Sequence, residues 1–423
     1  MLERGDAQRS RPRPPTAAGR RSGVAYAPAP RPLYPVSRLH LAAMSDGIGL
    51  WQHARGEEPD PRFGYCTDDM ARNLVVDVLH SRGGRSPAIE ASISRSLTFL
   101  EDAFDRPSGR FRNFRGAGGG WLEAEASEDS QARALAGLAA VTAELPGTGP
   151  ADRAGRLFER ALPAAPGFSA LRAISGAILA CNSACEAGLS SAVMPTYELL
   201  ADRLTEAFDT VAESVAAPGV DPFENPCDPV RARRPGGAAE PIEWLWPEPV
   251  LTYENALLPQ ALIVAGERLG RPAPLAMGCA VLDWLIETQA GDGGVFSPVG
   301  NSHWWPRRGQ RSRFDQQPIE AAAMVSAALD AFRVTSRWCY PAAAETAYGW
   351  FLGDNDLGVA LADPVDGSCF DGLTPGGVNR NQGAESTLMW LTALERIREL
   401  RGRQVEPGPV TAAETGDDRS LWP

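Results

Sequence analysis

Apolar residues recur at helical spacing along most of this chain, in segments separated by stretches rich in Gly, Pro and Asp. Residues 67–80, TDDMARNLVVDVLH, illustrate the pattern, because an acidic first turn precedes apolar residues on one face. Period-2 alternation, which indicates strands, is nearly absent. The pattern predicts about twelve helices, at residues 33–44, 67–80, 89–104, 130–145, 154–162, 170–186, 194–210, 255–269, 275–289, 319–332, 342–352 and 384–400.

Five short clusters of aromatic, acidic and amide residues run directly into helices of this set. They begin at Gly64, Ser127, Trp244, Phe314 and Asn381, roughly 60 to 70 residues apart, with one near-double gap after Ser127. This spacing is typical of stacked helical hairpins. We therefore expect an all-α fold, an (α/α)6 toroid of the six-hairpin type. The motif-bearing helices would form its inner ring and the plain helices its outer ring.

The barrel is expected to be a single domain over residues 33–403. Residues 1–32 are rich in Arg and Pro and lack the apolar stretch of a secretory signal, so they predict a disordered tail. Residues 404–423 are polar and rich in Pro and Gly, and predict a loose tail. Three inter-helix segments exceed ordinary connection lengths, and loops that long are usually functional: 216–243, 291–313 and 354–383.

Composition excludes several classes of function. The chain has 423 residues, of which 43% are hydrophobic and 22% charged, as in ordinary globular proteins. A net charge of −12 disfavours nucleic acid and anionic membrane surfaces as partners. No apolar run is long enough to span a membrane. Seven scattered cysteines without a CxxC pair favour reduced thiols and a cytoplasmic location. The four histidines are widely separated, so we expect no metal site. The sequence contains no nucleotide-binding motif, so we expect no cofactor.

Two pairs of neighbouring acids begin motif-bearing helices, and each precedes an arginine: Asp68 and Asp69 with Arg72, and Glu128 and Asp129 with Arg133. Acids in a first turn satisfy free backbone N–H groups and complement the helix dipole, so capping alone explains part of the pattern. One cap needs only one such residue, however. The second acid of each pair is therefore free to point into the barrel mouth.

Aromatic and amide residues accumulate in the later clusters, and their combination is typical of sugar binding. Aromatic faces stack on sugar C–H patches, while carboxylates and amides hydrogen-bond to hydroxyls. The densest clusters contain Trp244, Trp246, Glu248, Tyr253, Glu254 and Asn255, then Trp304, Trp305, Asp315, Gln316, Gln317 and Glu320, then Asn379, Asn381, Gln382 and Glu385. Several such clusters on one face suit a polyhydroxylated ligand.

Longer motifs, among them DGIGLWQHARGEEPDPRFGYCTDDMAR, LTYENALLPQAL, RFDQQPIEAAAM and CFDGLTPGGVNRNQGAEST, resemble a family of bacterial (α/α)6 proteins related to the six-hairpin glycosidases. Members often carry a glycosyltransferase label, in keeping with neighbouring glycosyltransferase and mannoside-processing genes. The resemblance covers about residues 41–400. It implies a barrel that processes glycans, in association with a separate glycosyltransferase.

The chain departs from that family where members read DDNAR and SEDSHGRALWALG. It has instead Met70, Gln131, Ala132 and Ala136. Because Gln131 lies near the position where the family has a His, we assign that position no proton-transfer role. The acidic residues and both motif arginines are retained, so the substitutions change the surroundings of the acids and not the acids themselves.

The leading hypothesis is a carbohydrate-active enzyme that acts on glycosidic bonds of an oligosaccharide or glycoside. An inverting mechanism needs two carboxyls about 6.5–9.5 Å apart, and we expect the acid at Glu248 or Glu254 and the base at Asp69 or Glu128. The expected substrate-binding residues are Trp51, Asp68, Arg72, Trp121, Asp129, Trp246, Tyr253, Asn255, Trp304, Asp315, Gln316, Gln317, Asn381, Gln382 and Glu385.

Three other functions remain open. The chain could itself be a glycosyltransferase, or a non-catalytic glycan-binding partner of one, with its acids serving only helix caps and hydroxyl contacts. An isomerase or epimerase on the same barrel would need inward-facing histidines. The four histidines of this chain lie mostly outside the motif-bearing helices, so this function ranks lower.

Overall fold

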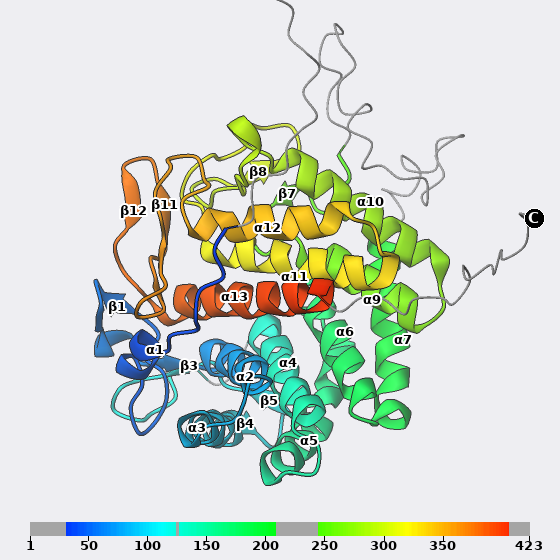
Figure 1. The fold of residues 1–423 in the computed structure, drawn as a ribbon. Helices are drawn as coiled ribbons and strands as arrows, with labels where there is room; N and C mark the ends of the chain where they lie inside the picture. Colours follow the sequence, from blue (N-terminus) through cyan, green and yellow to red (C-terminus); the bar gives the residue numbers. More distant parts are fainter. Residues whose placement is uncertain (1–30, 124–126, 209–243, 406–423) are drawn as a thin grey trace, which may run out of the picture.

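A computed structural model describes residues 31–123, 127–208 and 244–405, and Figure 1 shows their arrangement. Six helices form a closed inner ring, in which each contacts the next and the last contacts the first. These are α2 (Thr67–Ser81), α4 (Glu128–Glu144), α6 (Leu171–Glu186), α9 (Leu257–Arg268), α11 (Pro318–Thr335) and α13 (Ala384–Val405). The ring confirms the expected (α/α)6 architecture.

Outer helices pack against the inner helices that they follow or precede in the chain. The outer set is α3 (Pro87–Ala103) on α2, α5 (Gly149–Ala161) on α4, α7 (Ser190–Ala207) on α6, α10 (Pro272–Thr288) on α9 and α12 (Cys339–Phe351) on α11. The short α1 (Leu39–Ala43) lies against α13. Each long outer helix therefore forms a hairpin with an inner helix, as the spacing of the sequence clusters indicates.

Among the inner helices, α9 and α11 are apolar on nearly all sides, because neighbouring helices cover them. In α11, for example, the run Pro318–Val325 is entirely buried, including a carboxyl at Glu320. Small residues allow close contact between these helices. A Cβ at Gly137 of α4 would lie 2.7 Å from the carbonyl oxygen of Ala71 in α2, so only glycine fits there.

Short antiparallel ribbons decorate the barrel and connect its helices. Their strands are β1 (Ala54–Arg55) with β2 (Glu58–Pro59), β3 (Tyr65–Cys66) with β6 (Phe114–Arg115), β4 (Phe104–Asp105) with β5 (Arg110–Phe111), β7 (Val250–Leu251) with β8 (Trp305–Pro306), β9 (Ala362–Asp363) with β10 (Ser368–Cys369), and β11 (Gly372–Thr374) with β12 (Gly377–Asn379). Strand β3 runs directly into α2. Strands β1, β11 and β12 lie together beside the start of α13 (Figure 1).

Some helix predictions need correction. The predicted helix 33–44 is only the five-residue α1, and α7 begins at Ser190, four residues before its predicted start. Helix α6 belongs to the inner ring although no cluster precedes it, so motif-bearing helices do not account for the whole ring. The tails 1–30 and 406–423 and the long segment 216–243 lie outside the described residues, and the single domain over 33–403 stays a prediction.

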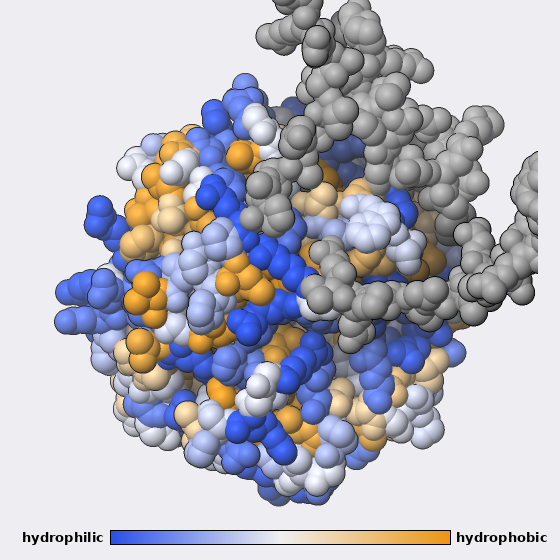
Figure 2. All heavy atoms as spheres, in the orientation of Figure 1, coloured by the Kyte–Doolittle hydropathy of each residue, from blue (hydrophilic) through white to orange (hydrophobic). Residues whose placement is uncertain are grey.

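The surface of the described part carries no large apolar patch. Its exposed large apolar side chains lie on separate elements: Leu33, Leu39, Phe63, Leu122, Leu199, Trp338, Leu357 and Val365. Hydrophilic and hydrophobic residues are intermixed over the face drawn in Figure 2. Among the helices that the structure describes, none combines the length and the apolar character needed to cross a bilayer.

Candidate functional site

Polar side chains at the starts of the six inner helices contact one another around one mouth of the barrel. Asp68 and Arg133 join α2 to α4, and Glu385 and Arg72 join α13 to α2. The segment before α9 contacts three inner helices: Glu254 binds Arg133 of α4, and Asn255 binds Arg172 of α6 and Glu320 of α11. Helix N-termini present free N–H groups and a positive dipole end, which favour acidic residues here.

A pocket of about 390 Å³ opens at this mouth, lined mainly from α2, the start of α13 and the loops before α2, α11 and α13. Its carboxyl residues are Asp68, Asp69, Asp315, Asp371 and Glu385, and its amide residues are Gln52, Asn113, Asn301, Gln316, Gln317 and Asn379. Arg72 is the cation of the lining, and its aromatic members are His53 and Phe114. The wall therefore carries more negative than positive charge.

Asp69 lies in this wall between a thiol and a guanidinium. The thiol of Cys66 donates to Asp69 Oδ2 at 3.0 Å, and Arg72 Nη1 donates to Oδ1 at 3.1 Å. Arg72 also binds Glu385, with 2.9 Å between Nη2 and Oε2. Burial raises the pKa of Asp69 to about 6, although Arg72 opposes the shift. A carboxyl of this kind can hold a proton near neutral pH and give it to a ligand.

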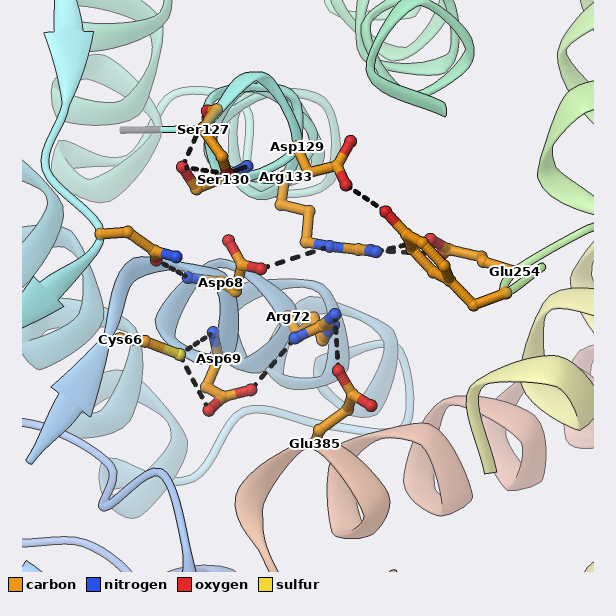
Figure 3. Close-up of polar contacts among 12 residues, drawn as sticks. Cys66, Asp68, Asp69, Arg72, Ser127, Asp129, Ser130, Arg133, Glu254 and Glu385 are labelled. Atoms are coloured by element: carbon orange, nitrogen blue, oxygen red, sulfur yellow. Dashed lines mark hydrogen bonds and ion pairs between the residues drawn. The ribbon is translucent and has the colours of Figure 1, made fainter. Parts of the chain in front are cut away.

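Asp68 lies beside Asp69 but contacts a different arginine (Figure 3). Its Oδ2 lies 3.7 Å from Arg133 Nε, and its Oδ1 is buried without a hydrogen-bond partner among the described residues. Burial raises the pKa of Asp68, against the opposing charges of Arg72 and Arg133. A buried acceptor without a donor is costly, so the position of Asp68 lowers the stability of the fold.

Arg133 points from α4 toward the centre of the mouth, between Asp68 and Glu254 (Figure 3). Both of its Nη atoms donate to Glu254, with 3.2 Å from Nη1 to Oε1. Burial acts to raise the pKa of Glu254, but Arg133 outweighs burial and the pKa falls below its ordinary value. Glu254 is therefore held ionised, as the partner of an arginine.

The turn that carries Glu254 is held from several sides. Glu254 has a left-handed backbone with φ of 49°, a costly conformation for a residue with a side chain. Its N–H donates to Glu320, and Asn255 Nδ2 donates to the same carboxyl at 3.0 Å. Burial raises the pKa of Glu320 to about 7. Trp304 and Asp315 also have positive φ, at 56° and 62°, so strained backbone gathers around this mouth.

A second polar network lies beside the pocket and binds the same turn. Arg172 Nε donates to the carbonyl of Tyr253 at 2.6 Å, and its Nη1 donates to Glu248 at 3.0 Å. The Tyr253 hydroxyl donates to Asp129 Oδ2, while Asp129 Oδ1 is buried without a partner among the described residues. The network places Tyr253 against the start of α4.

A further cavity of about 370 Å³ lies within the inner ring beneath the pocket. All six inner helices line it, largely with alanine, valine and leucine, and charged residues surround its far end. Arg72 lines both spaces, and Glu254 lines the lower one. The side chain of Arg72 therefore lies between the mouth pocket and the barrel interior.

The structure separates the four predicted catalytic acids. Asp69 lines the pocket, whereas Glu248 and Glu254 are bound by Arg172 and Arg133 outside the pocket lining. Glu128 accepts from the N–H groups of Ser169 and Ala170, both at 2.7 Å, and so caps the start of α6. These hydrogen bonds lower the pKa of Glu128 despite its partial burial.

None of the predicted sugar-stacking tryptophans lines the pocket. Trp51 stacks on Tyr65 with 4.2 Å between ring centroids, and Trp121 packs edge-on against Phe99. Trp246 is buried against Phe208, and Trp304 packs against Tyr253. Their contacts are with the protein, because the loops that carry them fold over aromatic neighbours.

The predicted amides also divide into two groups. Gln317 lines the pocket, and no described residue hydrogen-bonds to its amide. Gln316 also belongs to the lining, but its side chain is fully buried and already bound: its Nε2 donates to Asp356 at 2.6 Å and its Oε1 accepts from Trp350 at 2.8 Å. Asn381 and Gln382 do not line the pocket. Asn381 Oδ1 accepts from the backbone N–H of Gly56, and Gln382 is buried.

The sequence motifs do not predict several residues of the site. Arg172 lies on α6, the inner helix that no sequence cluster precedes, and a single arginine outside a motif does not indicate a site. Asp371 lies in the long segment 354–383, and the length of that segment is the sequence feature that indicates a functional loop. Its Oδ1 accepts from Gly383 N and Ser386 Oγ, both at 2.8 Å. His53 lies in the loop before α2. No group of His, Cys, Asp and Glu among the described residues is arranged to hold a metal ion.

Comparison with known proteins identifies the fold. Solved structures that are similar include a sugar epimerase from a ruminal bacterium (12% identity, TM-score 0.61, covering 86% of this chain and 97% of that one) and cellobiose 2-epimerase from Spirochaeta thermophila (14%, 0.59, 86% and 93%). An inactive variant of α-1,6-mannanase from Salegentibacter is also similar (10%, 0.51, 86% and 96%). The chain shares the (α/α)6 barrel fold of these structures.

No protein-family model and no curated protein matches the chain. At 10–14% identity, the similarity to these structures concerns the fold. Function on a shared fold is decided by the side chains of the site, so it must be argued from the mouth pocket.

Proposed function

We propose that this protein is a carbohydrate-active enzyme that cleaves a glycosidic bond in the mouth pocket. The observation that carries the proposal is the pair Asp68–Asp69, placed at the start of an inner helix in a polar, anionic pocket. Burial raises the pKa of both carboxyls, and that of Asp69 to about 6. Glycosidases need a carboxyl that is still protonated near neutral pH, and burial is a common way to provide it.

Asp69 serves as general acid, and a carboxyl on the facing wall serves as general base. Glu385 is engaged by Arg72, and Asp68 adjoins Asp69 on α2 and is paired with Arg133, which leaves Asp315 and Asp371 as the candidates for the base. Asp371 is held in place by Gly383 and Ser386. Inversion follows if the carboxyls lie about 6.5–9.5 Å apart with water between them.

The pocket suits an uncharged glycan. Cleavage passes through an oxocarbenium-like transition state, whose positive charge an anionic wall stabilises. The same wall repels carboxylated or phosphorylated sugars. Asp68, Gln317 and Asn301 supply acceptors and donors for sugar hydroxyls, so the selectivity for hydroxyl-rich ligands rests on hydrogen bonding and not on aromatic stacking.

One of the similar structures offers a parallel to the aspartate pair. The α-1,6-mannanase variant is inactive and has two consecutive aspartates replaced by alanine, and it was solved with α-1,6-mannotetrose. Asp68 and Asp69 are likewise consecutive. We therefore place mannosides first among the substrates to be tested. The expected cytoplasmic location and the association with a glycosyltransferase stay predictions.

An epimerase or isomerase is the second candidate. The epimerases and a D-mannose isomerase have TM-scores of 0.59 to 0.61, higher than the 0.51 of the mannanase, and His53 lines the pocket. Such an enzyme moves a proton at a sugar carbon and leaves glycosidic bonds intact. In D₂O it incorporates deuterium into the sugar, and a glycosidase does not.

The test is a screen of neutral mannosides and glucosides, with and without phosphate, on the full chain. The variants Asp69→Asn and Asp371→Asn should lower kcat about 10²–10⁴-fold. Glu128→Gln is the matched control, because it keeps an oxygen that can accept from Ser169 and Ala170 outside the pocket.

Three results would count against the proposal. Equal loss in Glu128→Gln would move the chemistry away from the pocket. Deuterium incorporation without cleavage would favour the epimerase. Saturable binding of glycans without turnover of any would leave a non-catalytic glycan-binding protein.

A further inference from the structure

The first turn of α2 is capped by a thiol. Cys66 is the N-cap residue, and its Sγ accepts from Asp69 N at 3.4 Å while its S–H donates to Asp69 Oδ2 at 3.0 Å. The side chain is buried and lines the mouth pocket. Ser, Thr, Asp and Asn are the preferred N-caps, and sulfur is a weak donor and acceptor. Capping alone therefore does not explain a cysteine here.

Helix α4 provides an internal comparison with an ordinary cap. Ser127 accepts from Ser130 N at 3.1 Å, and its hydroxyl donates to Ser130 Oγ at 3.2 Å. The geometry matches that of Cys66 and Asp69, because in both helices the cap side chain binds the backbone and side chain three residues on. In α2 the group held is a pocket carboxyl, whereas in α4 it is a hydroxyl.

We propose that Cys66 is a positioning residue for Asp69, whose S–H holds one carboxyl oxygen while Arg72 holds the other. The inference rests on the proposed function, in which Asp69 is the general acid. Two fixed oxygens set the plane of the carboxyl at the pocket wall. The hydroxyl of a serine, as a stronger donor, would stabilise the ionised carboxylate more and make Asp69 a stronger acid.

Other charged and titratable groups also face Asp69, and they are common to every variant compared below. They are Arg72 and Asp68 on α2, Glu385 on α13, and His53 and Asp371 in the loops of the same pocket. A change confined to residue 66 leaves these groups in place. Any ordered shift in the titration of Asp69 can then be assigned to the donor at that position.

The experiment compares Cys66→Ser, wild type and Cys66→Val in the full chain. Serine donates more strongly than the thiol, and valine fills similar space without donating. The high-pH limb of kcat should move in the order Ser below wild type below Val, with about one pH unit between the two variants. Ser127→Ala removes the corresponding N-cap of α4, which does not contact a carboxyl group. It should therefore leave the high-pH limb of kcat unchanged.

A second readout does not depend on turnover. The carboxyl of Asp69 is titrated by carbon-13 NMR, with its signal assigned by its loss in Asp69→Asn. The same order of pKa values supports the positioning role, even if no glycan is cleaved and the proposed function fails. If Asp69 titrates at the same pH in Cys66→Ser and in wild type, the inference is wrong. The comparison of these two proteins is sufficient if Cys66→Val does not fold.

Discussion

Arg133 and Glu254 lie 121 residues apart in the sequence and form a two-pronged ion pair at the barrel mouth. The pair joins α4 to the turn before α9, although α6 lies between these helices in the ring. Both side chains are largely buried, with 16% and 10% of their surface exposed. Arg133 lies between Glu254 and Asp68, so the pair connects the strained Glu254 turn to the candidate acids.

Removing one partner of this pair should destabilise the fold strongly. Arg133→Met leaves the Glu254 carboxylate buried and unpaired, which costs about 3–5 kcal/mol in the free energy of unfolding. The double variant Arg133→Met/Glu254→Gln should recover much of that loss, because the unpaired charge of Glu254 is removed as well. Urea denaturation measures both values. Equal stability of the single variant and wild type would show that the pair does not stabilise the fold.

Activity should depend on pH through Asp69. A general acid works only while protonated, so kcat should fall as pH rises through about 6, the raised pKa of Asp69. The limb should disappear in the residual activity of Asp69→Asn. The pH profile of kcat on the best glycan measures this limb, and a flat profile up to pH 8 would remove Asp69 from the role.

Stability should depend on pH through Glu320. Its pKa rises from 4.5 to about 7 on folding, so between these values the folded state keeps a proton that the unfolded state releases. Stability from this group is therefore present at low pH and lost as pH rises through that window, by about 3 kcal/mol in all.

The variant Glu320→Gln tests this linkage, because an amide does not titrate. It is expected to be less stable than wild type at pH 5, since its NH₂ group faces one of the donors Glu254 N and Asn255 Nδ2. The gap should narrow toward pH 7.5 as wild type loses the protonated form. Thermal denaturation over this range reports the difference, and a gap independent of pH would contradict the assignment.

The consecutive glutamines should behave differently. Gln316→Ala leaves Trp350 Nε1 without its acceptor, which costs about 1–3 kcal/mol of stability. Gln317→Ala removes a pocket amide without partners in the described residues, so stability should change by less than about 0.5 kcal/mol while KM rises. Melting curves and glycan kinetics on both variants separate the two. A raised KM in Gln316→Ala at unchanged stability would reverse the assignment.

The barrel could be predicted from the sequence because its signals are local. Each helical hairpin buries one face of its helices, so apolar residues recur at helical spacing. Because the hairpins follow one another along the chain, the polar clusters recur at a repeating interval. The pair Asp68–Asp69 with Arg72 could also be found, since a helix brings residues three and four apart onto one face. These interactions need no knowledge of distant parts of the chain.

The tertiary structure alone decided which acids and amides share the pocket. Glu248, Glu254 and Gln316 look like ligand-binding residues in the sequence, yet Arg172, Arg133 and Trp350 occupy them. Those partners lie 76, 121 and 34 residues away, and local patterning carries no information about such pairs. A polar side chain is available to a ligand only when no buried partner already satisfies it, and closure of the six-helix ring determines those partners.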